Sequence, residues 1–204
     1  MKKVLIPILM VATVAIGRQH IASQHHWELT DSETLWIGRY SNCQYGYYSL
    51  LPTGMVAHAE HPPAPHHGFL VSLPDISLRT EVTVYNSNRY LWVNGEYNTT
   101  EESTLAAVTD YQIALSREHG KNFKVVGLHS FKLRSVPATR HKAEYQSPRG
   151  QVVEDVVVVL RSGVVYELGL KTPAGNYAED REKFDQVLAG IRFTTRHNGQ
   201  CWNE

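Results

Sequence analysis

The chain lacks the charge imbalance that marks proteins of several functional classes. Its 204 residues include 20 basic and 20 acidic side chains, so the formal net charge is zero. No long basic run occurs, which argues against nucleic acid as a partner. The composition is otherwise globular, with 42% hydrophobic and 20% charged residues. We expect one domain, because a chain of this length can bury a core of its own.

The motifs of common catalytic sites are also missing. The sequence contains no GxSxG nucleophile motif, no HExxH motif and no glycine-rich phosphate loop. Acidic residues are spread along the chain, so no carboxylate pair for acid–base catalysis stands out. We therefore expect a non-enzymatic protein, and we assign no catalytic residue and no cofactor.

The N-terminal segment has the pattern of a secretory signal. Lys2 and Lys3 precede an uncharged apolar stretch over residues 4–16, which is shorter than the roughly 20 residues needed to span a bilayer. Small residues place the cleavage after residue 17 or after residue 23. A cleaved signal predicts a periplasmic or secreted protein with no stable membrane anchor. An uncleaved anchor is the alternative.

After the signal peptide, the chain divides into a leader and a domain. We expect the signal peptide over 1–23, a polar leader over 24–42 and one domain over 43–204. Trp27 and Trp36 are the only large anchors in the leader. Nothing in the sequence resembles an internal repeat.

Cysteine is scarce, with only Cys43 and Cys201 present. An even number of cysteines in an exported protein suggests a disulfide. Closing so long a loop would stabilise the fold by roughly 5 kcal/mol in the chain-entropy model. Two unpaired thiols are the alternative. A catalytic cysteine is disfavoured because the chain has no CxxC pair.

Hydrophobic patterns in the first half predict short strands and one helix. β-prone residues predict strands over 44–51, 69–73 and 78–85. An apolar stripe at helical spacing predicts a helix over 101–119, with Thr99 opening a capping box. The stripe consists of Leu105, Val108, Tyr111 and Leu115.

The second half has a more regular pattern. Strands are predicted over 123–131, 139–146 and 152–160, and Ser162-Gly163 is typical of a tight hairpin turn. A return strand begins at Val164, and a helix follows over 178–191. Runs of strands with few helices indicate an α+β fold, an antiparallel β-sheet flanked by helices.

This order of elements resembles the PsbP-like/Mog-type α/β/α sandwich family. Three stretches carry the resemblance: the strand QYGYYSLLP over 44–52, the helix followed by FKVV and VPATR, and the hairpin over 156–172 with its helix ending at Phe193. Many small exported bacterial proteins of unknown role look similar. The resemblance implies a PsbP-like sandwich and favours binding and assembly roles over catalysis. It assigns no functional residue to this chain.

The segment HAEHPPAPHHGF, residues 58–69, has four histidines in twelve residues. Its three prolines exclude a helix or a central strand, so we expect a loop. Imidazole is a good zinc or copper ligand, which makes the four histidines candidate metal ligands. They are His58, His61, His66 and His67. Their spacing matches no zinc motif, and a polar loop whose histidines titrate between about pH 5 and 8 is the alternative.

A second candidate is the segment YNSNRYLW over 85–92, which combines aromatic, amide and guanidinium side chains. Such side chains suit recognition of a sugar, a peptide or a partner surface, with Arg89 as the anchor and Tyr90 and Trp92 as contacts. The alternative is that both aromatic rings pack in the core while the asparagines form turns.

These observations favour an exported accessory or binding protein of the bacterial envelope. Its partner would be a protein or an envelope component, bound through loops at one end of the sheet. The alternative is a metal-binding or metal-dependent hydrolytic protein that uses the loop over 58–67 with zinc or copper.

Overall fold

The structure is a computed structural model that describes residues 26–29, 33–58, 67–73, 89–98 and 104–194. Several predictions lie outside the described residues: the signal peptide, the strand over 78–85, Thr99, His61, His66 and Cys201. In the part that is described, no helix has the length and apolar character needed to cross a membrane.

The described chain forms a large antiparallel sheet of nine strands in the order β1-β2-β5-β6-β7-β11-β10-β9-β8. The strands β7, β11, β10 and β9 are consecutive in this order, and each pairs antiparallel with the next. The strand bounds are β1 (His26–Leu29), β2 (Glu33–Ile37), β5 (Val56–His58), β6 (Gly68–Ser72), β7 (Tyr90–Tyr97), β8 (Lys121–Leu133), β9 (Val136–Ser147), β10 (Gly150–Arg161) and β11 (Val164–Pro173).

A smaller sheet packs beside the large one. It contains β3 (Arg39–Asn42), β4 (Tyr47–Leu50) and β12 (Ile191–Phe193), in the order β12-β4-β3. The segment that we expected to be a polar leader thus includes β1, β2 and β3. Tyr40 is the physical reason, because its ring is buried and packs edge-on against Trp36 with 4.8 Å between ring centroids. Tyr40 also contacts Phe69 of the large sheet.

Two α-helices are described: α2 (Leu105–Ser116) and α3 (Tyr177–Gly190). Thr104 caps α2, since its Oγ1 accepts a hydrogen bond of 3.2 Å from the Ala107 N–H. The helix therefore begins four residues after the start that we predicted. A 3₁₀ turn, η2 (Arg117–His119), extends it, and a second, η3 (Ala174–Asn176), precedes α3.

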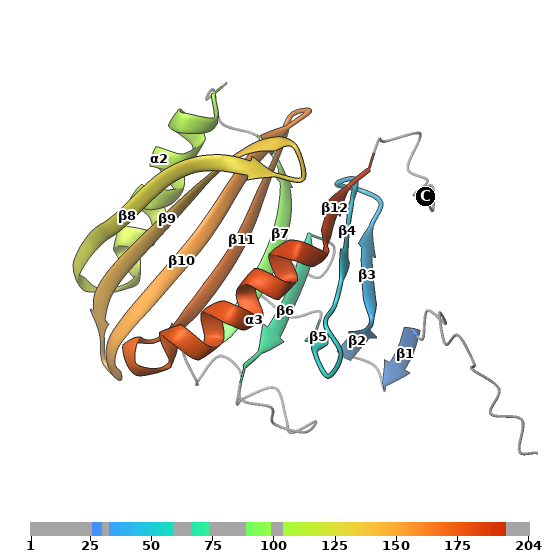
Figure 1. The fold of residues 1–204 in the computed structure, drawn as a ribbon, viewed down its shortest axis with the longest axis horizontal. Coiled ribbons are helices and arrows are strands. Elements are labelled where there is room, and N and C mark those ends of the chain that lie inside the picture. Colours follow the sequence, from blue (N-terminus) through green and yellow to red (C-terminus); the bar gives the residue numbers. More distant parts are fainter. Residues whose placement is uncertain (1–25, 30–32, 59–66, 74–88, 99–103, 195–204) are drawn as a thin grey trace, which may run out of the picture.

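The two helices cover opposite faces of the sheet, as Figure 1 shows. In β10, Val157 and Val159 belong to the core that includes Phe184 and Val187 of α3. Their neighbours Val156 and Val158 pack with Val108 of α2. A strand covered on both faces is apolar throughout, which explains the uninterrupted valine run of β10. The predicted α/β/α sandwich is confirmed.

Tight turns with positive φ connect the long strands. Ser162 and Gly163 have φ of 52° and 73°, the type I′ geometry that suits a two-residue hairpin, so this predicted turn is confirmed. Arg134 and Ser135 form a similar turn between β8 and β9, with φ of 51° and 69°. Pro137 is not part of this turn; it lies within β9, opposite Lys132 of β8.

Ionic contacts fix α3 on its face of the sheet. Arg140 of β9 donates two hydrogen bonds, of 2.7 and 2.8 Å, to the carboxylate of Asp155 in β10. The same guanidinium donates a 2.9 Å bond to Asp185 of α3. The Tyr177 hydroxyl, in the first turn of α3, also bonds Asp155.

Candidate functional site

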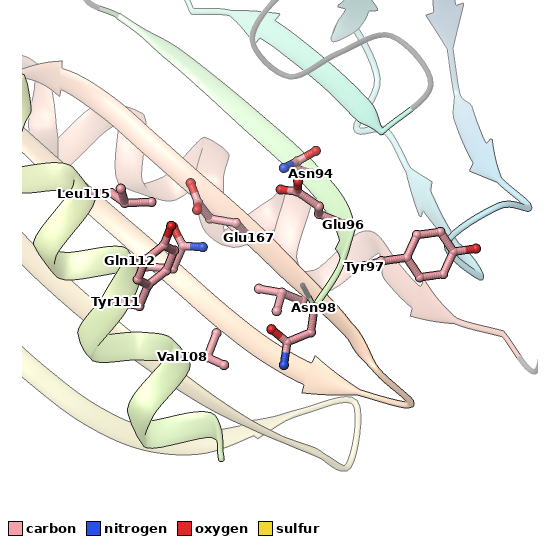
Figure 2. Close-up of a pocket in the computed structure, with 10 residues that line it drawn as sticks. Asn94, Glu96, Tyr97, Asn98, Val108, Tyr111, Gln112, Leu115 and Glu167 are labelled. Atoms are coloured by element: carbon pink, nitrogen blue, oxygen red, sulfur yellow. The ribbon is translucent and has the colours of Figure 1, made fainter. Parts of the chain in front are cut away.

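A pocket of about 280 Å³ lies between α2 and the strands β7 and β11 (Figure 2). Strand residues supply most of its polar atoms, and helix residues supply its opposite wall. The lining residues are Asn94, Glu96, Tyr97, Asn98, Val108, Tyr111, Gln112, Leu115, Val165 and Glu167. We refer to it as the α2 pocket.

Strand alternation and register place the polar groups of the floor. Side chains at every second position of a strand share one face, so Trp92, Asn94 and Glu96 of β7 point toward α2. In the antiparallel ladder, Asn94 is the direct partner of Glu167, and Glu96 is the partner of Val165. Directly opposed residues have Cβ atoms about 5 Å apart, so Asn94 and Glu167 form one polar pair.

Glu167 is the carboxylate of the pocket floor. Burial raises its pKa from 4.5 to about 7, although a hydrogen bond from Trp92 opposes that shift. This net pKa also includes a rise caused by the charges of Glu154 and Glu96 and a lowering caused by His119. A carboxyl that titrates near neutrality in a cleft is the kind of group that marks a functional site.

Trp92 holds this carboxylate in place. Its indole Nε1–H donates a bond of 2.6 Å to Glu167 Oε1. The ring packs directly on Gly169: a Cβ at that position would lie only 2.0 Å from Trp92 Cζ2. Only glycine leaves room for the ring, so this glycine determines where the indole donor sits.

Asn94 has a side-chain hydrogen-bond acceptor that receives no hydrogen bond. Its Oδ1 atom is buried and has no hydrogen-bond partner. A buried acceptor without a donor costs about 1 to 3 kcal/mol, so such groups call for an explanation. Asn94 belongs to the lining of the α2 pocket, but its Oδ1 atom itself is covered by protein.

The helix wall is more apolar and partly open. Val108 is buried, whereas Tyr111 and Leu115 are 45% and 41% exposed and form the lip. Gln112 adds an amide between them. Tyr97 points away from the other labelled side chains in Figure 2, and its hydroxyl bonds the Gln44 carbonyl.

A buried polar cluster adjoins the pocket on the same face. Glu154, only 1% exposed, accepts hydrogen bonds from His119 at 3.1 Å and Tyr145 at 3.2 Å. Burial raises the pKa of Glu154, but the His119 bond and charge outweigh it and the net pKa is lowered. Conversely, the bond to Glu154 raises the pKa of His119. Lys171, directly opposite Glu154, has its pKa lowered by burial.

The predicted binding residues do not form one site. Arg89 points to the α3 face, where it donates two bonds of 2.7 Å to the buried carboxylate of Asp180. Trp92 packs against the valine cluster under α2. It contacts the pocket only indirectly, by its hydrogen bond to the lining residue Glu167. Tyr90 is half-buried, and its ring lies 6.0 Å from the Lys171 ammonium. Arg89 and Trp92 therefore lie on opposite faces of the sheet, and a binding role for Arg89, Tyr90 and Trp92 stays a prediction.

The described histidines of the proline-rich segment lie at its two ends. His58 is the last residue of β5, and burial lowers its pKa. The His67 ring packs edge-on against Tyr45, with 5.0 Å between centroids. Among described residues, no three His, Cys, Asp or Glu side chains are grouped to hold a metal ion. The metal site remains a prediction, because His61 and His66 lie outside these residues.

Cys43 lies in the turn between β3 and β4, where it is half-buried. The chain returns to this turn at its other end, since the Thr194 N–H donates a 2.9 Å bond to the Gly46 carbonyl. Pairing of Cys43 with Cys201 remains a prediction.

Sequence analysis missed the α2 pocket because its members belong to three separate segments, β7 with the residue after it, α2 and β11. The return strand that contains Glu167 was predicted, but its pattern did not single out this residue. One indication was present: the apolar stripe of the helix needs a sheet face to cover, so the polar face of β11 could not all face solvent.

No known protein-family model matches the sequence, and no curated protein matches it either. Solved structures do share the fold. Cyanobacterial PsbP (CyanoP) from Synechocystis sp. PCC 6803 is similar with a TM-score of 0.54 and 13% identity, over 78% of this chain and 92% of that one. The Saccharomyces cerevisiae Ran-binding protein Mog1p is similar with a TM-score of 0.50 and 7% identity, over 84% and 96%. The chain therefore has the PsbP/Mog-like fold.

Proposed function

We propose that this protein is an exported, non-enzymatic accessory protein of the bacterial envelope that binds its partner through the α2 pocket. The observation that supports it most is the pocket floor, where the Trp92 indole holds the Glu167 carboxylate in a cleft with an apolar helix wall. A few positioned polar groups in such a cleft suit recognition of a ligand.

The pocket lining favours binding over catalysis. The described residues that line it include no serine, threonine, cysteine, histidine, lysine or arginine. A nucleophile activated by an adjacent base needs one of these side chains in most hydrolytic mechanisms. Carboxylates, amides and aromatic rings around an apolar wall instead resemble a recognition surface.

Export rests on the sequence. Lys2 and Lys3, followed by the apolar stretch over 4–16, have the order of charge and apolar residues that a secretory signal requires. A structural neighbour, Mog1p, is named as a Ran-binding protein, so the same fold serves protein binding elsewhere. This adds to the proposal by analogy of fold alone.

Site-specific photo-crosslinking in the native cells tests the proposal. A photoreactive residue replaces Leu115 at the lip of the pocket, and a matched control replaces Leu128 on β8, which is 56% exposed. We expect a discrete adduct from position 115 that the control does not give. Equal labelling from both positions, or none from position 115, would contradict the proposal. Recovery of the captured ligand in a chemically altered form would also contradict the proposal, because the proposed protein is not an enzyme.

A further inference from the structure

The α2 pocket has a charge pattern that selects among ligands. Its described lining includes the carboxylates of Glu96 and Glu167, and no cationic side chain. An anion would meet only repulsion from these groups, whereas a donor-rich cation would satisfy both.

The register of the two strands sets the spacing of these acceptors. Asn94 is directly opposite Glu167, and Glu96 lies two residues further along β7 on the same face. A direct pair has Cβ atoms about 5 Å apart and a diagonal pair about 7 Å apart. A single ammonium group donates three hydrogen bonds in three directions, which suits acceptors spaced around one point.

The opposite wall fits the remainder of such a ligand. Val108, Val165 and Leu115 supply apolar contacts from α2 and β11. An alkyl stem can lie along such a surface while its charged head reaches the polar groups. Trp92 keeps Glu167 in position through its bond of 2.6 Å, so the carboxylate is preorganised.

We infer that the α2 pocket binds a primary ammonium group on an alkyl stem, as in a lysine side chain or a free alkylamine. This inference rests on the proposed function, because it names the ligand class of the same pocket. Glu167 holds the ammonium, Glu96 provides the outer acceptor, and the helix residues contact the stem.

The ionisation of Glu167 gives the binding a pH dependence. Burial raises the pKa of this carboxyl to about 7, so its negative charge is lost in mild acid. The groups that face it are Glu154 from β10, His119 from η2 and Glu96 from β7, with Lys171 on its own strand. Protonation of His119 at lower pH adds a positive charge nearby. Both changes weaken binding of a cation as the pH falls.

NMR of the ¹⁵N-labelled chain with n-butylammonium tests the inference. The indole signal of Trp92 is the reporter, since its Nε1–H bonds Glu167 directly. Trp92→Phe identifies this signal among those of the four tryptophans. At about pH 8, we expect a saturable shift of this signal with n-butylammonium and none with butan-1-ol, a neutral molecule of the same length. The affinity should be about tenfold lower at about pH 5, the loss of one charge-assisted hydrogen bond.

Glu167→Gln is the matched variant, because glutamine keeps the shape and can still accept the indole bond. We expect it to bind n-butylammonium about tenfold more weakly. A shift that butan-1-ol reproduces, or the absence of a saturable shift in the wild-type protein, overturns the inference. The comparison of the two probes needs only the wild-type protein, so the test survives a variant that fails to fold.

A second titration distinguishes the two sources of the ammonium. The peptide Gly-Gly-Lys-Gly-Gly should bind more tightly than n-butylammonium if the ligand is a polypeptide, and equally if it is a free amine. Either result requires the ammonium, because the same peptide with norleucine in place of lysine should not bind. A specific crosslink from position 115 together with no response to amines would overturn this inference alone. Absence of the crosslink would count against the proposed function.

Discussion

The indole Nε1–H of Trp92 donates a hydrogen bond of 2.6 Å to Glu167 Oε1, across neighbouring strands of the sheet. This contact joins the valine cluster beneath α2 to the polar floor of the pocket. Because the ring lies over Gly169, the position of the carboxylate depends on a glycine that does not line the pocket. Substitutions that disturb this pair should therefore change both the stability of the fold and binding at the pocket.

Gly169→Ala should displace the Trp92 ring. A Cβ there would lie within 2.3 Å of three ring atoms, so the indole must move. We expect the free energy of unfolding to fall by about 1 to 3 kcal/mol, as for other overpacked cores. Urea unfolding measures the change. Gly175→Ala is the control, since nothing lies within 4 Å of a Cβ at that exposed turn. Equal effects of the two substitutions would contradict the packing described here.

Glu167→Gln should alter how stability depends on pH. The pKa of Glu167 is about 7 in the folded protein and ordinarily 4.5. A raised carboxyl pKa contributes stability that is complete below about pH 4.5 and is lost as the pH rises through about 7. Wild-type stability should therefore fall relative to the variant between about pH 5 and pH 8. Urea midpoints of both proteins at the two pH values measure this, and a constant difference would contradict it.

Asp180→Asn should destabilise the contact between α3 and the start of β7. Asp180 is fully buried, and it accepts bonds from Arg89 and from the Thr172 hydroxyl. Loss of its charge leaves the guanidinium without its main partner, and we expect a loss of about 3 kcal/mol. Glu179→Gln is the matched control, because Glu179 also meets Arg89 but is 61% exposed. Its effect on the free energy of unfolding should be much smaller, because a solvated surface pair contributes little. Similar losses from both variants would show that burial of the pair is not what matters.

The two cysteines should behave as one unit if they form the predicted disulfide. Cys43→Ser and Cys201→Ser should each lower the free energy of unfolding by roughly 5 kcal/mol, since both open the same loop. The double variant should lose no more than either single one. Urea unfolding without reductant gives these values. Additive effects, or free thiols that react with iodoacetamide in the native protein, would contradict the pairing.

The proline-rich histidine segment should bind zinc and copper only weakly if it is a polar loop. Calorimetric titration of protein starting at Gln24 measures this, with His25 and His26 substituted in every sample to remove the contribution of the N-terminal segment. The comparison is between this protein and the same protein with His66→Ala and His67→Ala. One site per chain with submicromolar affinity, lost in the double variant, would establish a metal centre and favour the metal-binding alternative.

Local sequence patterns predicted the second half of the fold well. The valine run of β10, the Ser162-Gly163 turn and the alternation of β11 are set by neighbours in the chain, so they are visible without tertiary information. The stripe that includes Phe184 likewise identified α3, whose bounds agree within a residue.

Other elements depend on contacts that are distant in sequence. The segment predicted as a leader forms strands because Tyr40 packs on Phe69, almost thirty positions away. The segment over 85–92 was interpreted as a recognition segment because of its aromatic, amide and guanidinium side chains. Its last three residues begin strand β7, in which Asn94 and Glu96 line the α2 pocket. The pair of Asn94 and Glu167 exists only through strand register, which a single sequence does not display.

The central claim is that the partner of this protein binds at the α2 pocket, and methyl NMR tests it most directly. Isotope-labelled protein is added to an envelope extract of the native cells, and the methyl signals are followed. The account predicts that Val108, Leu115 and Val165, which line the pocket, shift or broaden. Val126 and Leu128, exposed on β8, should not change. Changes confined to β8, with the pocket methyls unaffected, would contradict the account.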